Sequence, residues 1–123
     1  MAGSIKDILK NPYSIIVSGS LWIEANGEHF CGPGPIELLE RIEATGSISM
    51  AAKEMKMSYK KAWELVNNLN AHTARPMVIP HAGGEKGGGS TITPEAVELI
   101  NFHRQMRERF AAFLASETDR LKK

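Results

Sequence analysis

Two consecutive segments near the middle of the chain repeat apolar residues at the spacing i, i+3, i+4, i+7, which places one apolar face on a helix. The first face holds Ile48, Ala51, Ala52 and Met55, and the second holds Ala62, Leu65, Val66 and Leu69. Ser47 and Ser58 precede the two segments, and serine is a preferred N-cap residue. The pattern predicts a helix-turn-helix over residues 47–71.

Another apolar stripe precedes this pair of helices. Its members are Ile36, Leu38, Leu39 and Ile42. Pro35 suits the first turn of a helix, where its missing N–H costs nothing, and Gly46 is expected to end that helix. The three stripes together predict a three-helix core over residues 36–74.

A tight hairpin is predicted upstream of the core. Asn26-Gly27 separates two short mixed runs at 21–24 and 28–31, and both turn residues tolerate a positive φ. A β-branched run just before them extends or precedes this hairpin. We therefore expect N-terminal strands over residues 14–31.

A second hairpin and a long helix are predicted downstream of the core. Five glycines lie within residues 83–89, between two short apolar runs, so residues 77–92 are expected to form a glycine-rich hairpin. A cap, a proline and an acidic residue at 93–95 then open a helix over 93–121. The predicted fold is mainly α with small β elements: a winged helix-turn-helix with an N-terminal β-hairpin and a long C-terminal helix. The glycine-rich hairpin is its wing, and one domain spans residues 1–123.

The long helix carries more large apolar residues than the core of a small domain can cover. The seam consists of Leu99, Phe102, Met106, Phe110 and Phe113. Such a surface marks an interface, and pairing of two long helices about a two-fold axis would give a homodimer. The alternative is that the seam folds back onto the chain's own core.

Composition supports a soluble globular chain, with 42% hydrophobic and 24% charged residues among 123. No apolar run approaches the ~20 residues of a membrane span, and no signal peptide is visible. With one cysteine and no internal disulfide, a cytoplasmic location is expected. The formal charge of +1 conceals a net −3 over residues 1–45 and +3 over residues 46–75. The basic third can face a polyanion.

In a helix-turn-helix the start of the second helix reads base edges in the major groove. The residues off its apolar face are Tyr59, Lys60, Lys61, Glu64, Asn67 and Asn68. Lysine reaches guanine or phosphate, and asparagine pairs with adenine. Five positions are predicted to contact DNA: Ser58, Tyr59, Lys60, Lys61 and Asn67. The alternatives are a merely solvated lysine face, a Tyr59 that packs against the preceding helix, and a Trp63 that is either core or groove-facing.

The glycine-rich loop is expected to contact DNA through Gly84, Lys86 and Gly87. Glycines let the backbone approach the minor groove or a phosphate closely, and Lys86 supplies charge. A nucleotide-binding P-loop is excluded, because Gly87 follows Lys86 where that motif needs serine or threonine. A plain flexible loop tip is the alternative.

Residues 46–53 (GSISMAAK), residues 57–63 (MSYKKAW) and the double glycine cluster at 83–89 resemble the N-terminal DNA-binding domain of molybdate-dependent transcriptional regulators, the ModE type. The resemblance covers roughly residues 21–114, whereas the first segment alone also fits other helix-turn-helix proteins, such as the LysR type. It implies a DNA-binding regulator that dimerises. Full-length regulators of this type continue into small barrel domains that bind the oxyanion. Here no segment remains for such a barrel, so molybdate binding is not expected from this chain alone.

Catalysis has little support. The histidines at 29, 72, 81 and 103 lie on unrelated elements without metal-ligand spacing, so no metal, cofactor or enzyme activity is expected. A dyad of His29 with Cys31 would need a third, orienting group, and Cys31 is more simply a buried strand residue. The sequence predicts a homodimeric transcriptional regulator that binds double-stranded DNA. The alternative is a protein-interaction module that docks partners through the long helix and no longer binds nucleic acid.

Overall fold

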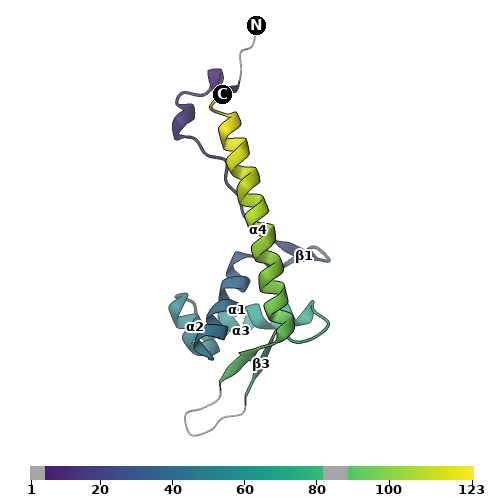
Figure 1. Cartoon of the computed structure of the whole chain (residues 1–123). Coiled ribbons are helices and arrows are strands. Elements are labelled where there is room, and N and C mark those ends of the chain that lie inside the picture. The colour runs from purple at the N-terminus through teal and green to yellow at the C-terminus, as the bar shows by residue number, and fades with distance from the viewer. Residues whose placement is uncertain (1–4, 82–88) are drawn as a thin grey trace. The chain divides into compact units, whose positions relative to one another are not determined.

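The computed structural model describes residues 5–81 and 89–123 (Figure 1). Two short 3-10 turns come first, η1 (Ile5–Ile8) and η2 (Pro12–Ser14). The strands are β1 (Ile23–Ala25), β2 (Glu28–Cys31), β3 (Val78–Pro80) and β4 (Ser90–Ile92). The helices are α1 (Pro33–Thr45), α2 (Ile48–Glu54), α3 (Tyr59–Ala71) and α4 (Pro94–Arg120). The mainly α fold with two small antiparallel strand pairs and a long C-terminal helix is confirmed.

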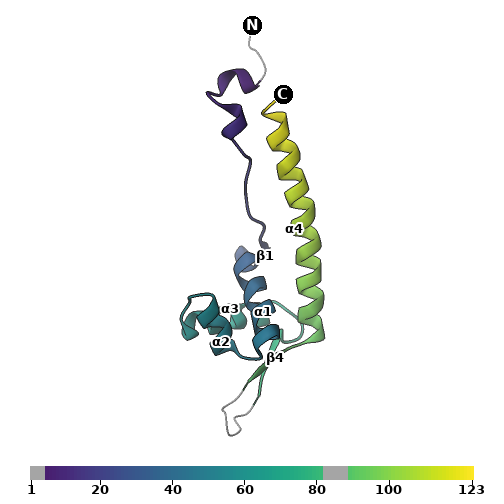
Figure 2. The ribbon, with the colours of Figure 1, turned by 60° about the vertical axis from the view of Figure 1, so that its left-hand side comes forward.

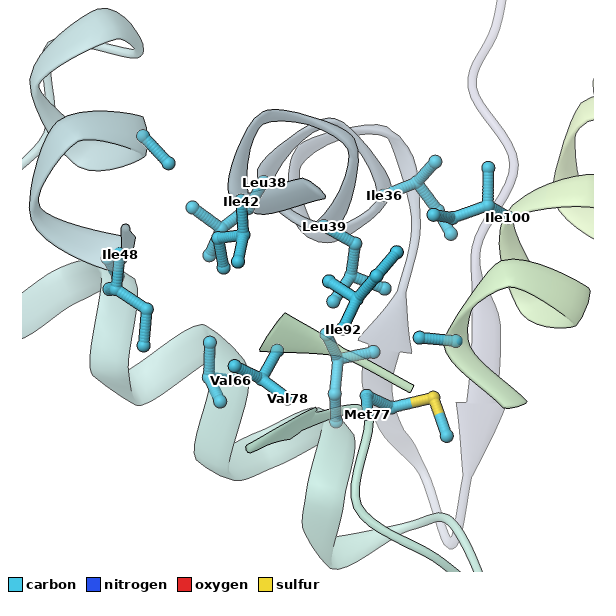
Figure 3. Packing of buried hydrophobic residues seen from close by; sticks show 14 of the residues in the cluster. Ile36, Leu38, Leu39, Ile42, Ile48, Val66, Met77, Val78, Ile92 and Ile100 are labelled. Atoms are coloured by element: carbon cyan, nitrogen blue, oxygen red, sulfur yellow. The ribbon is translucent and has the colours of Figure 1, made fainter. Parts of the chain in front are cut away.

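The hydrophobic core lies among α1, α2, α3, the two strand pairs and the start of α4. The helices contribute the stripes that their apolar spacing predicts, and β3 and β4 close one side with Val78 and Ile92 (Figure 3). Leu38, Leu39 and Ile42 of α1 are fully buried at the centre. α1 is therefore the helix on which the helix-turn-helix and the wing are both supported.

The β1–β2 hairpin forms as predicted, but the strands are shorter than the expected 14–31. Asn26 and Gly27 adopt φ values of 52° and 82°, the left-handed conformation that a tight turn requires. Residues 15–22 lie in neither a helix nor a strand. One reason is visible at Val17, whose N–H donates to the side-chain hydroxyl of Thr118 at 2.8 Å rather than to a neighbouring strand.

α1 begins at Pro33, three residues before the expected start at residue 36. Pro33 occupies the first helical position, where its missing N–H is no loss, and Ile36 N–H donates to the Gly32 carbonyl at 3.0 Å. At the other end, Gly46 adopts a φ of 72° and its N–H bonds to the Ile42 carbonyl. The predicted glycine stop is confirmed.

The chain divides into two compact units, and the single domain over residues 1–123 stays a prediction. Trp22–His103 form one unit, and the residues up to Leu21 together with Arg104–Lys123 form the other. The boundary falls inside α4, where no change of composition or linker marks it. In the described part of the chain, no helix is long and apolar enough to cross a membrane.

Candidate nucleic-acid interface

Serine caps fix the starts of both helices of the helix-turn-helix. Ser47 Oγ accepts the N–H of Met50 at 3.1 Å, and Ser58 Oγ accepts the N–H of Lys61 at 3.0 Å. Each bond satisfies one of the N–H groups that a helix leaves unpaired at its start. The two helices predicted over residues 47–71 are thus held by the residues that the sequence identifies.

The turn between α2 and α3 depends on a left-handed residue. Lys56 adopts a φ of 56°, and Met57 N–H reaches back to the Ala52 carbonyl at 3.0 Å. Ala51 and Ala62 are fully buried. Their small side chains allow two helices to pack closely after so short a turn.

The start of α3 presents an exposed polar face. Ser58, Lys60, Lys61 and Asn67 are all exposed, and Tyr59 is 55% exposed. These five are the residues predicted to contact DNA, and the structure brings them together on one helix and its cap. Their contact with DNA stays a prediction.

Of the two alternatives for Trp63, the structure shows packing against the core, and the role facing the DNA groove stays a prediction. It is half-buried and packs against the core, and Tyr59 meets its ring edge-on, with centroids 6.3 Å apart and an interplanar angle of 79°. Tyr59 therefore packs along its own helix while keeping more than half its surface exposed. One aromatic pair links the core to the outer face of α3.

Two asparagines further along α3 have structural partners. Asn68 Nδ2 donates to the His29 carbonyl at 3.0 Å, and Asn70 Oδ1 accepts the N–H of Met77 at 2.7 Å. The first bond ties α3 to β2, and the second ties α3 to the entry into β3. Asn68 and Asn67 are neighbours in sequence, but only Asn67 is exposed.

The base of the wing is anchored to the corner between α1 and α2. His81 N–H donates to the Gly89 carbonyl at 2.8 Å, and Ser90 N–H donates to the Gly46 carbonyl at 2.8 Å. A Cβ on Gly89 would lie 2.9 Å from the Gly46 carbonyl oxygen, so this close approach needs glycine. Figures 1 and 2 show β3 and β4 projecting from the helices at this point. Gly84, Lys86 and Gly87, predicted to contact DNA, lie outside the described residues.

A groove of about 190 Å³ joins the wing to the helix-turn-helix, and we call it the wing-root groove. It is lined by Ser47, Ile48, Ser49, Tyr59, Trp63, Pro80, His81, Gly89 and Ser90. The starts of α2 and α3 and the base of the wing therefore share one surface. Sequence reasoning missed Ser49, His81 and Ser90 as members, because only the folded hairpin brings them beside α3.

The apolar seam of α4 is covered unevenly. Phe102 and Phe113 are 59% and 56% exposed, whereas Leu99, Met106 and Phe110 are half-buried. Leu99 packs against the core, so that end of the seam folds back as the alternative supposed. Phe102 and Phe113 are the seam residues exposed for an interface, and their role in a dimer stays a proposal.

The two residues considered for catalysis, His29 and Cys31, differ in exposure. Cys31 is completely buried on β2, and this burial raises the pKa of its thiol to about 11. His29 is exposed, and its Nδ1 lies 2.9 Å from Glu24 Oε2. Residues 5–81 and 89–123 contain no cluster of three or more His, Cys, Asp or Glu that could hold a metal ion.

Comparison with known proteins finds relatives over the greater part of the chain. The molybdenum transport protein ModE of Azotobacter vinelandii is 36% identical over 86 residues, 70% of this chain and 32% of that protein. The transcriptional regulator ModE of Haemophilus influenzae is 38% identical over 74 residues, 60% of this chain and 29% of that protein. The molybdenum-pterin-binding protein MopB of Rhodobacter capsulatus is 40% identical over 85 residues, 69% of this chain and 32% of that protein.

The chain spans about a third of the length of these curated relatives. No protein-family model matches it. The matched share is consistent with an N-terminal domain of the ModE type.

Proposed function

We propose that this chain, a homologue of the ModE and MopB regulators, is a transcriptional regulator that binds double-stranded DNA sequence-specifically as a homodimer. The start of α3 enters the major groove, and the wing contacts the adjacent backbone or minor groove. One observation carries the proposal: the exposed lysines Lys60 and Lys61 follow the capped start of α3, whose Tyr59 shares the wing-root groove with the wing base. One protein surface can thus meet the duplex with both elements.

The names of the relatives support this proposal. The matched proteins include a DNA-binding transcriptional dual regulator ModE of Escherichia coli, 38% identical over 74 residues. Catalysis forms no part of the proposed function. Molybdenum appears in the names of some relatives, and we do not transfer it to this chain. That this chain alone does not bind molybdate stays a prediction.

The exposed Phe102 and Phe113 of α4 support the homodimer. Large exposed apolar side chains on one helix mark an interaction surface. A two-fold dimer would place two copies of α3 about 34–36 Å apart, one turn of B-DNA, on successive major-groove faces.

The test is a titration of the purified chain with fluorescent duplexes at several salt concentrations, followed by selection from a random duplex library. We expect affinity that falls steeply with salt, together with a preferred sequence of two-fold symmetry. Sedimentation should report a dimer in the absence of DNA. A dimeric chain without salt-sensitive binding to any duplex would instead support the protein-interaction module.

A further inference from the structure

The wing-root groove presents hydrogen-bond donors and no carboxylate. Of its nine lining residues, Ser47, Ser49 and Ser90 carry hydroxyls, and Tyr59, Trp63 and His81 carry O–H or ring N–H groups. None is aspartate or glutamate. Three other grooves of the described chain differ in this respect, because their walls include Glu43, Glu117, or Glu95 with Glu98.

We infer that the wing-root groove holds one backbone phosphate of the bound duplex. The inference rests on the proposed function, and it adds a ligand chemistry and a set of residues that the start of α3 alone does not supply. Phosphate oxygens only accept hydrogen bonds, and they carry negative charge. A groove that offers donors on several sides and no competing carboxylate suits that group better than a base edge, which mixes donors and acceptors.

The donors of the groove are compatible with the hydrogen bonds that already hold its walls. Ser47 Oγ accepts the Met50 N–H, so its hydroxyl proton stays available for a ligand. The Nε2 atom of His81 bonds with Thr91 Oγ1, which fixes the imidazole ring on the wall. Nδ1 is the second ring nitrogen, and when protonated it can donate a hydrogen bond to a ligand.

The position of the groove also fits a phosphate. It lies between the start of α3 and the wing base. In the proposed complex α3 enters the major groove and the wing contacts the adjacent backbone or minor groove. The sugar-phosphate backbone separates the major groove from the minor groove. A protein that contacts both sides must span that backbone, and phosphate contacts fix its register on the duplex.

The first experiment compares Ser49→Ala, Tyr59→Phe and His81→Gln with Ser18→Ala and Tyr13→Phe, two exposed positions outside the groove. Binding is measured on the duplex selected by the wild-type chain. We expect each groove variant to bind about 3- to 10-fold more weakly, because each loses a hydrogen bond to a charged group. The preferred sequence should not change. The two control variants should bind as the wild type does.

The second experiment uses the wild-type chain and needs no variant to fold. Single methylphosphonates, which are neutral, replace the phosphates of the selected duplex one at a time. Phosphates bound by the exposed lysines are also expected to respond. Outside those phosphates, one methylphosphonate should weaken wild-type binding about 3- to 10-fold. The same methylphosphonate should change the affinity of the Ser49→Ala/His81→Gln double variant less than 2-fold.

The outcomes distinguish failure of the phosphate site from failure of the proposed DNA binding. If the wild-type chain binds duplex DNA but every methylphosphonate weakens wild-type and double variant equally, the groove does not hold a phosphate. A groove variant that changes the preferred base instead assigns the groove to base reading and overturns the inference. If the wild-type chain binds no duplex at all, the proposed function itself fails.

Discussion

Asn68 Nδ2 donates a hydrogen bond to the backbone carbonyl of His29 at 3.0 Å, and so ties the middle of α3 to the β1–β2 hairpin. Its neighbour Asn67 is exposed and has no such bond to the hairpin among the described residues. Two adjacent residues of the same type therefore have different surroundings. This difference can be measured.

Replacing Asn68 by alanine should lower the free energy of unfolding by about 1 kcal/mol, because a side-chain hydrogen bond between two elements is lost. Replacing Asn67 by alanine should leave stability nearly unchanged and weaken binding to the selected duplex. Urea unfolding and a fluorescence titration of both variants test the assignment. The reverse result, with stability lost at Asn67 and affinity at Asn68, would contradict it.

Removing the charges of Lys60 and Lys61 together, as Lys60→Gln/Lys61→Gln, should weaken binding to any duplex and lower the salt slope by about two. Both side chains are exposed, so the fold should survive. The matched control is Lys6→Gln/Lys10→Gln, which removes the same charge from exposed positions in the other unit. An unchanged slope for the first pair removes these lysines from the interface.

Lys56 occupies a left-handed conformation that costs any residue with a Cβ about 1 kcal/mol. Lys56→Gly should therefore be more stable than Lys56→Ala by about 1 kcal/mol, although both remove the same charge. Urea midpoints of the two variants provide the measurement. Equal midpoints would mean that the turn does not hold residue 56 at a positive φ in solution.

Gly32 lies against the indole of Trp22, since a Cβ added there would be 2.4 Å from Trp22 Cδ2. Gly32→Ala should destabilise the chain by about 1–3 kcal/mol, because the indole must move. It should also shift the fluorescence of Trp22 in a Trp63→Phe background. Gly34→Ala is the control: a Cβ at Gly34 meets no atom within 4 Å, and alanine there should be neutral or slightly stabilising.

The buried thiol of Cys31 predicts a pH dependence of stability. Burial raises its pKa from the ordinary 9.0 to about 11. Between these values the unfolded chain releases the thiol proton and the folded chain keeps it, so this contribution to stability is intact below about pH 9 and is lost as pH rises toward 11. Urea unfolding across that range should show a decline that Cys31→Ala lacks. A thiol reagent at pH 8 should react with the wild-type chain only on unfolding.

Local signals in the sequence predicted most of the fold. The serine caps at 47 and 58, the Asn26-Gly27 turn and the Gly46 stop each act within a few residues, so the pattern of neighbouring residues is enough to predict them. The same reasoning placed Pro35 correctly in the first turn of α1 but expected the helix to start at residue 36, whereas Pro33 already occupies the first helical position.

Contacts between distant parts of the chain could not be predicted in this way. The bond between Asn68 and His29 joins residues 39 positions apart, and the bond between Val17 and Thr118 joins residues 101 positions apart. The candidate site divides in the same manner. The exposed face of α3 follows from helical periodicity, whereas His81 joins the wing-root groove only through the pairing of β3 with β4.

Gly46 ends α1, and its carbonyl accepts a hydrogen bond from the Ser90 N–H. Gly89 lies so close to the same carbonyl oxygen that it leaves no room for a Cβ. A foreign hairpin grafted onto this corner would have to keep a backbone N–H at position 90 and glycine at positions 46 and 89. Under the proposed function, the residues between the anchors could be varied to seek a new preferred duplex, but the attachment points could not. Engineering of altered specificity should therefore begin beyond these anchors.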